Sequence, residues 1–544
     1  MKLPRLGEFA IALALTGVLG WPAVATVREA WIEAGGAESV GDTGGVARPL
    51  GLAVETTRLV LVAGAIALPA GLALAVGLFR TDLPGRRSAL GLLVFAAFVP
   101  LPIHAAAWIG ALGNLGRMQV LGSRPLLIGW PGAAFVHAMA ALPWVVLFAG
   151  VGLRSVEPEL EEAALLDLPA WRVVVQVTLR RAVGAIAGAA LAVAVLTAGD
   201  MTVTDLLQVR TYAEEAYTQF GQGHGPGTAA AVALPPLVLL GITITLGMRA
   251  LLWADPARFP SASSRPRDWS LGAWRIPSAM LVWASLATLL ILPLYGLCWR
   301  AGRVGGSAAA GEGPKWSVSG LATTLRAAVS ELFGRPDLIL PTTLLWSAVG
   351  ALVATCLAWG LAWEARQSGS WRWVAALSLT LALATPGPVV GMSLVLAYGG
   401  IRWIHATPAI LVIAYALRTF PYAFLVLWPA VVGLPSAYQE AATLDGLGAW
   451  GQFRRVALPI CGGGLLTAWG VALVLAMGEV PASNPVELPG TTTAAKLLWH
   501  LLHTGTESHL AGIVLILLAP FAAAGGLIAL AIGPRFTGSG WRTR

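Results

Sequence analysis

The sequence has little charge and almost no cysteine. Only 11% of its 544 residues are charged, whereas 57% are hydrophobic, and soluble domains carry about 25% charged residues. A soluble globular fold is therefore excluded, and the alternating segments of about ten residues that form membrane β-barrels are also lacking. The three cysteines, Cys298, Cys356 and Cys461, lie far apart inside apolar runs, so we expect buried thiols and neither a disulfide framework nor a metal site.

A phosphate-binding loop is missing as well. No Gly-x-x-x-x-Gly-Lys-Ser/Thr motif occurs, and such a loop cradles the phosphates of ATP in many ATPases. The chain is therefore not expected to hydrolyse ATP or to carry a cofactor. The net charge of +8 does not indicate nucleic-acid binding, because basic residues of membrane proteins collect on cytoplasmic loops and set the orientation.

What the sequence has instead is a series of long apolar runs. Runs near the ~20 residues that a membrane helix needs predict an all-α polytopic membrane protein with twelve transmembrane helices, near residues 8–26, 57–79, 89–112, 128–151, 182–199, 228–250, 276–298, 341–363, 374–398, 408–433, 461–478 and 511–533. The first run also resembles a signal peptide, with a basic start and Ala-Val-Ala near its end. We interpret it as a retained helix, and cleavage is the alternative.

The chain divides into two halves of six helices. A segment rich in Pro, Ser and Arg, 254–275, predicts a cytoplasmic linker between residues 1–253 and 276–544. Residues 279 apart match in the two halves: Trp171 with Trp450, Leu179 with Leu458, Gly199 with Gly478, and His224 with His503. Equal helix numbers in like orientation predict a parallel repeat about an axis along the membrane normal. The density of basic residues on alternate loops predicts that both termini are cytoplasmic.

A short charged segment recurs between the fourth and fifth helices of each half. The first, within 154–181, carries Glu162, Ala163, Ala164, Asp167 and Trp171; the second, within 435–460, carries Glu440, Ala441, Ala442, Asp445, Gly446, Trp450 and Phe453. In the second copy a helix-forming run ends at Gly446, and Trp450, Phe453 and Ala457 follow at helical spacing. This pattern predicts a bent helix pair whose apolar stripe fits a groove on a soluble partner. Chance recurrence of Glu-Ala-Ala in an Ala-rich chain is the alternative.

These residues resemble the cytoplasmic motif of the membrane-spanning permeases of binding-protein-dependent ABC importers. That motif is Glu-Ala-Ala, three residues, Gly, and then about nine residues to a hydrophobic position before Leu-Pro. The second copy matches as far as Leu458 and Pro459, whereas the first has Leu168-Pro169 in place of the Gly and Arg180 in place of the last Pro. The first loop is therefore expected to bend differently.

The resemblance implies a type I importer permease-like fold in the inner membrane. It also implies two ABC ATPase subunits, which bind ATP and Mg²⁺ and dock on both loops with the glutamates facing their basic residues, and an extracytoplasmic solute-binding protein. Segments 201–220 and 478–505 look like those of fused two-half permeases for ferric iron. Ferric iron is thus the expected solute, and thiamine, sulfate, polyamines and phosphonates remain alternatives, because permeases for these solutes share the architecture.

Two other classes of protein fit part of the pattern. A secondary transporter driven by an ion gradient also uses repeats and twelve helices, but it usually needs ionisable residues in mid-membrane, and carboxylates are scarce at the predicted helix centres. A membrane scaffold without transport is the other alternative, and it would need no ATPase partner.

Prolines and one arginine are candidates for the translocation path. Pro100 and Pro102 in the third helix, and Pro386 and Pro388 in the ninth, form Pro-x-Pro motifs that kink helices and free carbonyls for a path, or merely bend the helix against its neighbours. Arg418 lies in the middle of the tenth helix, where a charge predicts a functional site. It would bind an anionic solute or form a structural ion pair.

Two acidic residues at matched positions are further candidates. Asp200 and Glu479 follow the fifth and eleventh helices, each with a hydroxyl four residues later, at Thr204 and Ser483. They would receive a cation or cap the short helices that follow, and capping is the favoured interpretation. A metal-ligand role for the matched histidines, His224 and His503, is not favoured.

Overall fold

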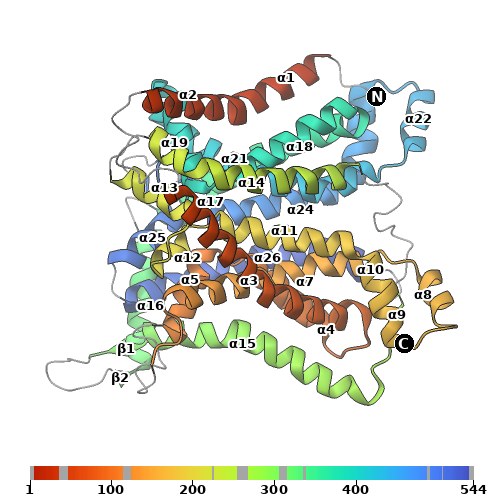
Figure 1. Cartoon of the computed structure of the whole chain (residues 1–544), viewed down its shortest axis with the longest axis horizontal. Coiled ribbons are helices and arrows are strands. Elements are labelled where there is room, and N and C mark those ends of the chain that lie inside the picture. Colours follow the sequence, from red (N-terminus) through yellow and green to blue (C-terminus); the bar gives the residue numbers. More distant parts are fainter. Residues whose placement is uncertain are drawn as a thin grey trace.

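The computed structural model describes residues 5–35, 47–113, 124–222, 226–253, 267–305, 315–334, 338–486, 491–504 and 507–537. Long helices run side by side through the molecule, and short elements gather at its two ends (Figure 1). Among these residues, eight helices are long and apolar enough to cross a membrane, or up to eleven if each of three bent pairs is one span. The prediction of a helical polytopic membrane protein is therefore confirmed.

The first half contains these elements in chain order: α1 (Arg5–Leu15), the π-helix η1 (Thr16–Gly20), α2 (Trp21–Gly35), α3 (Ala47–Arg80), α4 (Arg86–Ala97), α5 (Leu101–Leu112), α7 (Gly129–Arg154), α8 (Pro158–Ala164), α9 (Ala170–Val173), the π-helix η2 (Val174–Thr178), α10 (Leu179–Arg181), α11 (Val183–Ala198), α12 (Thr202–Leu206), α13 (Tyr212–Gly221) and α14 (Pro226–Leu252). Their order matches six predicted spans, with α8 to α10 between the fourth and the fifth.

The second half begins with η4 (Gly272–Trp274), a 3₁₀ turn, and continues with α15 (Arg275–Ala301), β1 (Arg303–Val304), β2 (Lys315–Trp316), α16 (Val318–Phe333), α17 (Ile339–Gln367), α18 (Gly369–Ala384), α19 (Gly387–Tyr398), α20 (Arg402–His405), α21 (Ala409–Val432), α22 (Ser436–Leu444), α23 (Ala449–Gln452), the π-helix η6 (Phe453–Ala457), α24 (Leu458–Met477), α25 (Ala494–Thr504) and α26 (Glu507–Thr537). Each of the twelve predicted segments falls on a helix or a bent pair. Their arrangement as twelve spans in two repeats stays a prediction.

The first long helix of each half packs against the other half. Helix α2 lies against α19 of the second half as well as α14 of its own half, and α15 lies against α5 of the first half as well as α26 of its own half. A hydrogen bond between the halves accompanies each of these contacts. Trp21 Nε1 donates to the Ala397 carbonyl (3.0 Å), and Arg300 Nη2 donates to the Ile109 carbonyl (3.3 Å). Figure 1 shows α2 and α15 at opposite edges of the bundle. The two halves are therefore interlocked through their first helices.

The Pro-x-Pro motifs break their helices rather than kink them. Helices α4 and α5 meet at 105°, and α18 and α19 meet at 108°. Pro100 and Pro386 are the N-caps of α5 and α19, in the extended conformation (φ −62°, ψ about 150°). The proline rings disfavour helical backbone geometry at the preceding residues, Val99 and Thr385. The predicted third and ninth helices are thus bent pairs, which corrects the prediction of continuous kinked helices.

A hairpin and a helix that the sequence did not predict follow α15. Strands β1 and β2 pair antiparallel, Arg303 with Trp316. Helix α16 then begins at an N-cap serine, because Ser317 Oγ accepts from the Gly320 amide at 2.9 Å. It packs on α26. These elements lie at the end of the bundle away from α8 and α22 (Figure 1).

The described end of the predicted linker is attached to the first half. Residues 254–266 lie outside the described part of the chain. The Trp269 amide donates to the Arg80 carbonyl at 2.7 Å, and the Asp82 amide donates to the Trp269 carbonyl at 3.2 Å. The end of the linker therefore runs beside the turn that joins α3 to α4.

Candidate functional site

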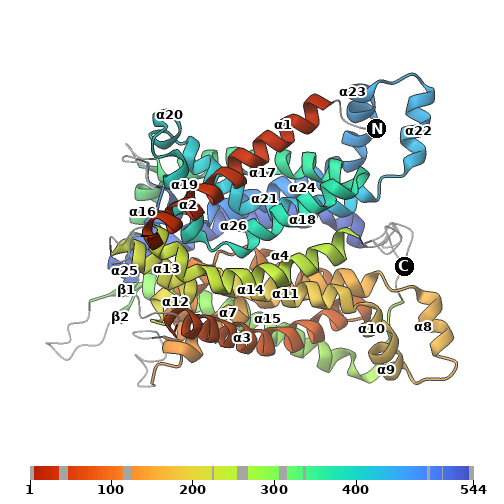
Figure 2. The ribbon, with the colours of Figure 1, turned by 45° about the horizontal axis from the view of Figure 1, so that its top comes forward.

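The two charged loops predicted from the sequence lie at the same end of the molecule. Figures 1 and 2 show α8 and α22 projecting from one end of the bundle. In the second loop α22 ends at Leu444, and Gly446 takes a φ of +75°, which favours glycine. In the first loop Pro169 is the N-cap of α9 instead. The loops thus turn by different local chemistry, in line with the missing glycine of the first.

Large apolar side chains project from both loops at matched positions. Leu166 is 85% exposed and its match Leu444 is 89% exposed; Trp171 and Trp450 are 63% and 72% exposed. The sequence argument singled out both tryptophans but missed both leucines. The signal was available, because Leu166 and Leu444 are separated by the same 278 residues as Glu162 and Glu440. Paired exposed apolar residues at one end of a molecule are typical of an interaction surface.

The Glu-Ala-Ala residues differ in their exposure to solvent. Glu162 and Glu440 are exposed, and so are the alanines that follow them, Ala163 and Ala441. Ala442 is buried and its match Ala164 is half-buried. Asp167 and Asp445 are exposed. Glu162 Oε1 lies 3.7 Å from Nη1 of Arg267, a residue of the linker. The glutamates are therefore accessible to a partner.

The predicted apolar stripe of the second loop mostly faces the chain itself. Phe453 packs edge-on against Trp359 of α17, with ring centroids 6.0 Å apart, and Ala457 is buried. Trp450 stacks on the outer side of Phe453 at 5.3 Å and is the exposed member. The inner part of the stripe, at Phe453 and Ala457, thus packs on the bundle, and Trp450 is its outermost member. A contact of Phe453 with a partner stays a prediction.

Arg418 has partners within the chain. Its Nη1 donates to the Thr385 carbonyl at 3.1 Å, at the break between α18 and α19, and its Nε lies 3.5 Å from Oε2 of Glu479. The structure thus contains the ion pair and the freed carbonyl that the alternative interpretation required. An anionic solute would have to compete with Glu479 for this guanidinium.

The matched acid of the first half, Asp200, has no such charged partner. Its Oδ2 lies 3.7 Å from His137 Nε2 of α7, which is too far for a hydrogen bond, and that buried nitrogen makes no hydrogen bond within the described residues. The Asp200 carboxylate also accepts from the amides of Thr202 (3.1 Å) and Val203 (2.9 Å), and Glu479 accepts from the Ala482 amide (2.9 Å). Both acids therefore cap the turns that follow them. Glu479 has in addition the guanidinium of Arg418 from the fourth long helix of its half.

The hydroxyls predicted beside these acids make the same bond in both halves. Thr204 Oγ1 donates to the Asp200 carbonyl at 3.4 Å, and Ser483 Oγ donates to the Glu479 carbonyl at 2.6 Å. Both hydroxyls are buried. Their protons are thus directed to backbone carbonyls, as in a capped turn.

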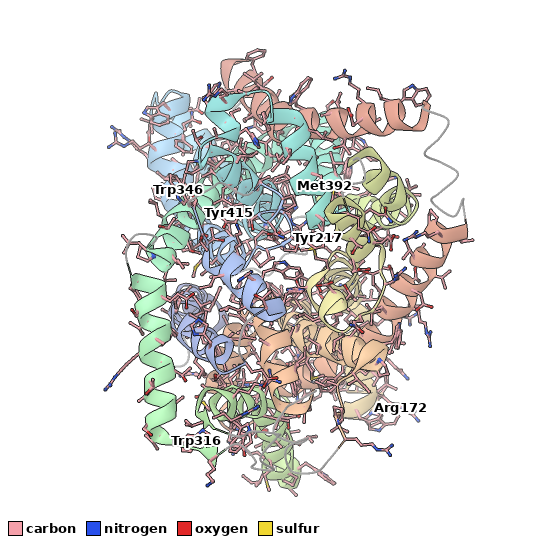
Figure 3. The ribbon with its side chains drawn as sticks, turned by 90° about the vertical axis from the view of Figure 1, so that its left-hand side faces the viewer. Arg172, Tyr217, Trp316, Trp346, Met392 and Tyr415 are labelled. Atoms are coloured by element: carbon pink, nitrogen blue, oxygen red, sulfur yellow. The ribbon has the colours of Figure 1, made fainter. Side chains whose placement is uncertain are left out.

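Six residues from matched positions meet at the end opposite the loops, and we call them the axial cluster. They form three pairs. Met201 and Val480 are 279 residues apart, whereas Ala213 and Ala495, and Tyr217 and Trp499, are 282 apart, which corresponds to a gap of three residues between the halves. All are buried except Tyr217, which is partly buried, and the rings of Tyr217 and Trp499 meet edge-to-face at 5.8 Å. Figure 3 looks onto this end and shows Tyr217 near its centre. The two halves thus close against each other through the same three positions of each.

Two polar links between the halves flank the axial cluster. Asn484 Nδ2 donates to the Tyr217 hydroxyl at 2.9 Å, and His503 Nε2 donates to Asp205 Oδ2 at 2.7 Å. Asp205 and Asn484 are themselves 279 residues apart. The hydrogen bond to Asp205 raises the pKa of the His503 imidazole, against burial, which lowers it. His503 Nδ1 lies 2.9 Å from the Trp499 carbonyl, so both ring nitrogens face acceptors, which favours the imidazolium form.

The matched histidines do not form a metal site within the described residues. His224 lies outside them, and no group of three or more His, Cys, Asp or Glu side chains in the described part of the chain could hold a metal ion. The three cysteines form no disulfide within the described residues: Cys461 is buried, Cys298 is half-buried and Cys356 is exposed. The expectation of a buried thiol thus fails for Cys356, which points out from the apolar face of α17.

The break at Pro100 packs closely against the second half. A Cβ on Gly478 would lie 2.4 Å from Pro100 Cγ. A small apolar pocket beside this contact is lined by Pro100, Pro102, Met477 and Gly478, among others.

Comparison with known proteins finds similarity to transport proteins within the second half. Residues 350–536 match the family described as "Binding-protein-dependent transport system inner membrane component". The matched region contains the second Glu-Ala-Ala loop, Arg418 and Glu479, and it ends in α26. The chain is also similar to a protein of Bacillus subtilis (strain 168) named "Putative molybdenum transport system permease protein", with 28% identity over 162 residues, which cover 27% of this chain and 71% of that protein.

Both findings support a permease subunit of an ABC importer. Members of the matched family are transport components and not enzymes, and the family implies ATPase and solute-binding partners in general. A multi-pass protein of this kind is consistent with the inner membrane.

Proposed function

We propose that this single chain forms both halves of the translocation path of an ABC importer. Residues 1–253 and 276–544 are the two halves, residues 254–275 join them, and the loops 154–181 and 435–460 each bind one ATPase subunit. The observation that carries the proposal is the recurrence of one exposed surface at one end of the bundle. Each copy offers a glutamate, a leucine and a tryptophan at matched positions.

The chemistry of this surface fits a soluble partner with basic residues around an apolar groove. Leu166 and Leu444 would fill apolar pockets, and Glu162 and Glu440 would pair with the basic residues. Burying a leucine fully contributes about 1.5–3 kcal/mol, so two loops with two large side chains each supply a substantial interface. The resemblance of the loops to the permease motif supports ATPase subunits as the partner.

The proposed orientation has both termini and both loops in the cytoplasm of the inner membrane. The axial cluster then closes the path on the outer side, where a solute-binding protein would deliver its cargo. ATP binding would draw the two motor subunits together, move the loops, and rotate the halves so that the axial cluster parts. This chain carries out no covalent chemistry in that cycle, and ATP and Mg²⁺ bind to the motor.

The solute is proposed on two separate grounds. The likeness of segments 201–220 and 478–505 to fused ferric-iron permeases supports ferric iron. The similarity to a protein named for molybdenum transport supports a second candidate, an oxyanion of molybdenum, for which Arg418 offers a positive charge beside the α18–α19 break. Thiamine, sulfate, polyamines and phosphonates share the architecture and are tested in the same assay.

The experiment is a co-purification followed by uptake. Wild-type protein and the Glu162→Lys/Glu440→Lys variant are solubilised from membranes of the native host, and the co-purifying chains are identified. An ATPase that accompanies the wild type and is lost from the variant supports the proposal. The control is Glu55→Lys, a charge reversal on an exposed side chain of α3, which should keep the ATPase. Retention of the ATPase by the double variant, or its absence throughout, would refute the assignment of the loops.

Transport is then measured in vesicles with labelled ferric iron and labelled molybdate in parallel. Uptake that needs ATP and survives an ionophore supports an ABC importer, and the label that accumulates names the solute. Uptake that the ionophore abolishes would instead support a secondary transporter driven by an ion gradient.

A further inference from the structure

Both loops must be fixed to the membrane helices if a motor is to move those helices through them. This point rests on the proposed function. The two loops return to the bundle through π-helices at matched positions, η2 at 174–178 and η6 at 453–457. Despite this correspondence, the side chains that attach each loop to the bundle are different.

The first loop is attached by a buried ion pair. Arg80, at the end of α3, forms an ion pair with Glu161 of α8, and both side chains are fully buried. The other Glu161 oxygen accepts from the Thr178 hydroxyl of η2, and Arg80 Nη1 donates to the Leu153 carbonyl of α7 at 2.9 Å. One charged cluster therefore connects four elements: the loop helix, the π-helix and two long helices.

The second loop lacks this cluster. Arg366 ends α17 as Arg80 ends α3, but Gln439 occupies the position of Glu161 and Ala457 that of Thr178. Arg366 Nη2 donates to the Leu434 carbonyl just after α21, so the contact of the arginine with the fourth long helix is kept. A glutamine cannot supply the charge, and an alanine cannot supply the hydroxyl.

An aromatic stack takes the place of the ion pair. Phe453 of η6 lies between Trp359 of α17, at 6.0 Å, and Trp450 of α23, at 5.3 Å. The corresponding positions of the first half are Ala73 on α3 and Val174 on η2, so no such stack can form there. Each half thus has one attachment and lacks the other.

The backbone gives a reason for the difference. In the second half, Trp450–Met477 is one continuous helix, so the π-helix passes directly into α24. In the first half, Ala170–Arg181 and Val183–Ala198 meet at 66°, and movement of the loop is not passed rigidly along the chain. A charged cluster that joins α8 and η2 to α3 and α7 provides the missing connection.

We infer that the chain uses two different attachments to carry motor movement into its halves: the Arg80–Glu161 ion pair in the first and the Trp359–Phe453–Trp450 stack in the second. Arg80, Glu161, Trp359 and Phe453 are positioning residues that hold the loops. Trp450 stacks on Phe453 and also belongs to the exposed surface that, with the glutamates and leucines, binds the motor.

The test measures loop mobility in the full-length protein without any motor, so its outcome does not depend on the proposed function. A nitroxide label is placed at Leu166→Cys or Leu444→Cys in a background that lacks the three native cysteines. Glu161→Gln, which copies Gln439, should mobilise the label at 166 and leave the label at 444 unchanged. Phe453→Ala should do the reverse. Equal effects on both labels, or none on either, would overturn the inference.

A rescue variant distinguishes a lost attachment from a general loss of folding in the second half. Gln439→Glu gives Arg366 the carboxylate that Arg80 has, so it should restore the immobility of the label at 444 in the Phe453→Ala background. A purely structural role of Phe453 predicts no such rescue, and failure of the rescue would refute the equivalence of the attachments.

In the complex with its motor, Glu161→Gln should keep the ATPase bound and lose uptake per ATP hydrolysed. Full coupling in this variant would refute the transmission role even if the label at 166 were mobilised. Loss of the ATPase itself would count against the separation of holding from binding.

Discussion

Truncating the central ring of the axial cluster should open the outer end of the path. Trp499→Ala removes a buried indole that contacts Tyr217 edge-to-face at 5.8 Å. Truncation of a buried aromatic residue costs about 3–5 kcal/mol. Met201, Ala213 and Tyr217 belong to the first half, whereas Val480 and Ala495 belong to the same half as the indole. Roughly half of the cost therefore falls on contacts that opening would break.

The expected effect is a shift of about 2 kcal/mol toward the open state, which corresponds to about 30-fold in the equilibrium constant. The assay is the rate at which a membrane-impermeant thiol reagent modifies Met201→Cys, a fully buried position, in a background without the native cysteines. In sealed vesicles with the outer face exposed, the rate should rise about 30-fold in Trp499→Ala.

Trp403→Ala is the matched control, because this tryptophan lies on the short helix α20 and is exposed. It should leave the rate unchanged. An unchanged rate in Trp499→Ala would show that the axial cluster does not keep the path closed. Modification of Met201→Cys only from the opposite face would refute the proposed orientation.

Three further predictions concern links between or within the halves. Because the bond to Asp205 raises the pKa of His503, the charged link is complete below the ordinary pKa of about 6.5 and loses its positive charge as pH rises through the raised pKa. Thiol reactivity itself rises with pH, so the rate at Met201→Cys is divided by the rate at an exposed cysteine, Trp403→Cys. This ratio should be about twofold higher at high pH, and Asp205→Asn should abolish the difference. Gly478→Val overlaps a proline of α5 and should lower stability by about 1–3 kcal/mol, seen as a lower Tm, while Gly462→Val, with open space around it, should not. Arg418→Met leaves the Glu479 carboxylate without its partner and should reduce the yield of folded protein, which Arg418→Met/Glu479→Gln should restore; if the double variant also regains uptake, the arginine does not bind the solute.

The positions of the helices and loops were predictable because local sequence determines them. Apolar runs of sufficient length fall on the helices, and Gly446 adopts the positive φ that ended the predicted helix. The exposed glutamates and tryptophans lie where the recurring motif put them. A sequence motif does not show which distant residues its members contact. Glu161 was therefore given no role, although it directly precedes Glu162.

Directions of side chains were harder to predict than positions. Helical spacing placed Trp450, Phe453 and Ala457 on one face, and Trp450 and Phe453 do stack on each other, but the spacing could not show that Phe453 and Ala457 pack on the bundle. The breaks at Pro100 and Pro386 were read as kinks because a sequence window cannot show how far two segments diverge. That angle depends on close packing with distant residues, such as Gly478 against Pro100.

The axial cluster was accessible to sequence reasoning in one respect. The register of 279 residues pairs Met201 with Val480, and a gap of three more residues pairs Tyr217 with Trp499. A search that allowed this gap would have matched both pairs. It would not have shown that the matched residues touch, because contact depends on how elements distant in the sequence pack, and the structure shows that packing at α13 and α25.

The two functional ends are connected by the fifth long helix of each half. Met201 follows the last residue of α11 by three positions, and Val480 follows the last residue of α24 by three positions. The 28-residue helix that ends at Met477 is about 42 Å long, so a tilt imposed at Trp450 moves Val480 directly. In the first half the 66° bend at Ala182 would absorb such a tilt unless the loop also moves α3 and α7. A motor that moves both loops equally would therefore displace the two sides of the axial cluster by different routes, which is why the charged attachment is needed only in the first half.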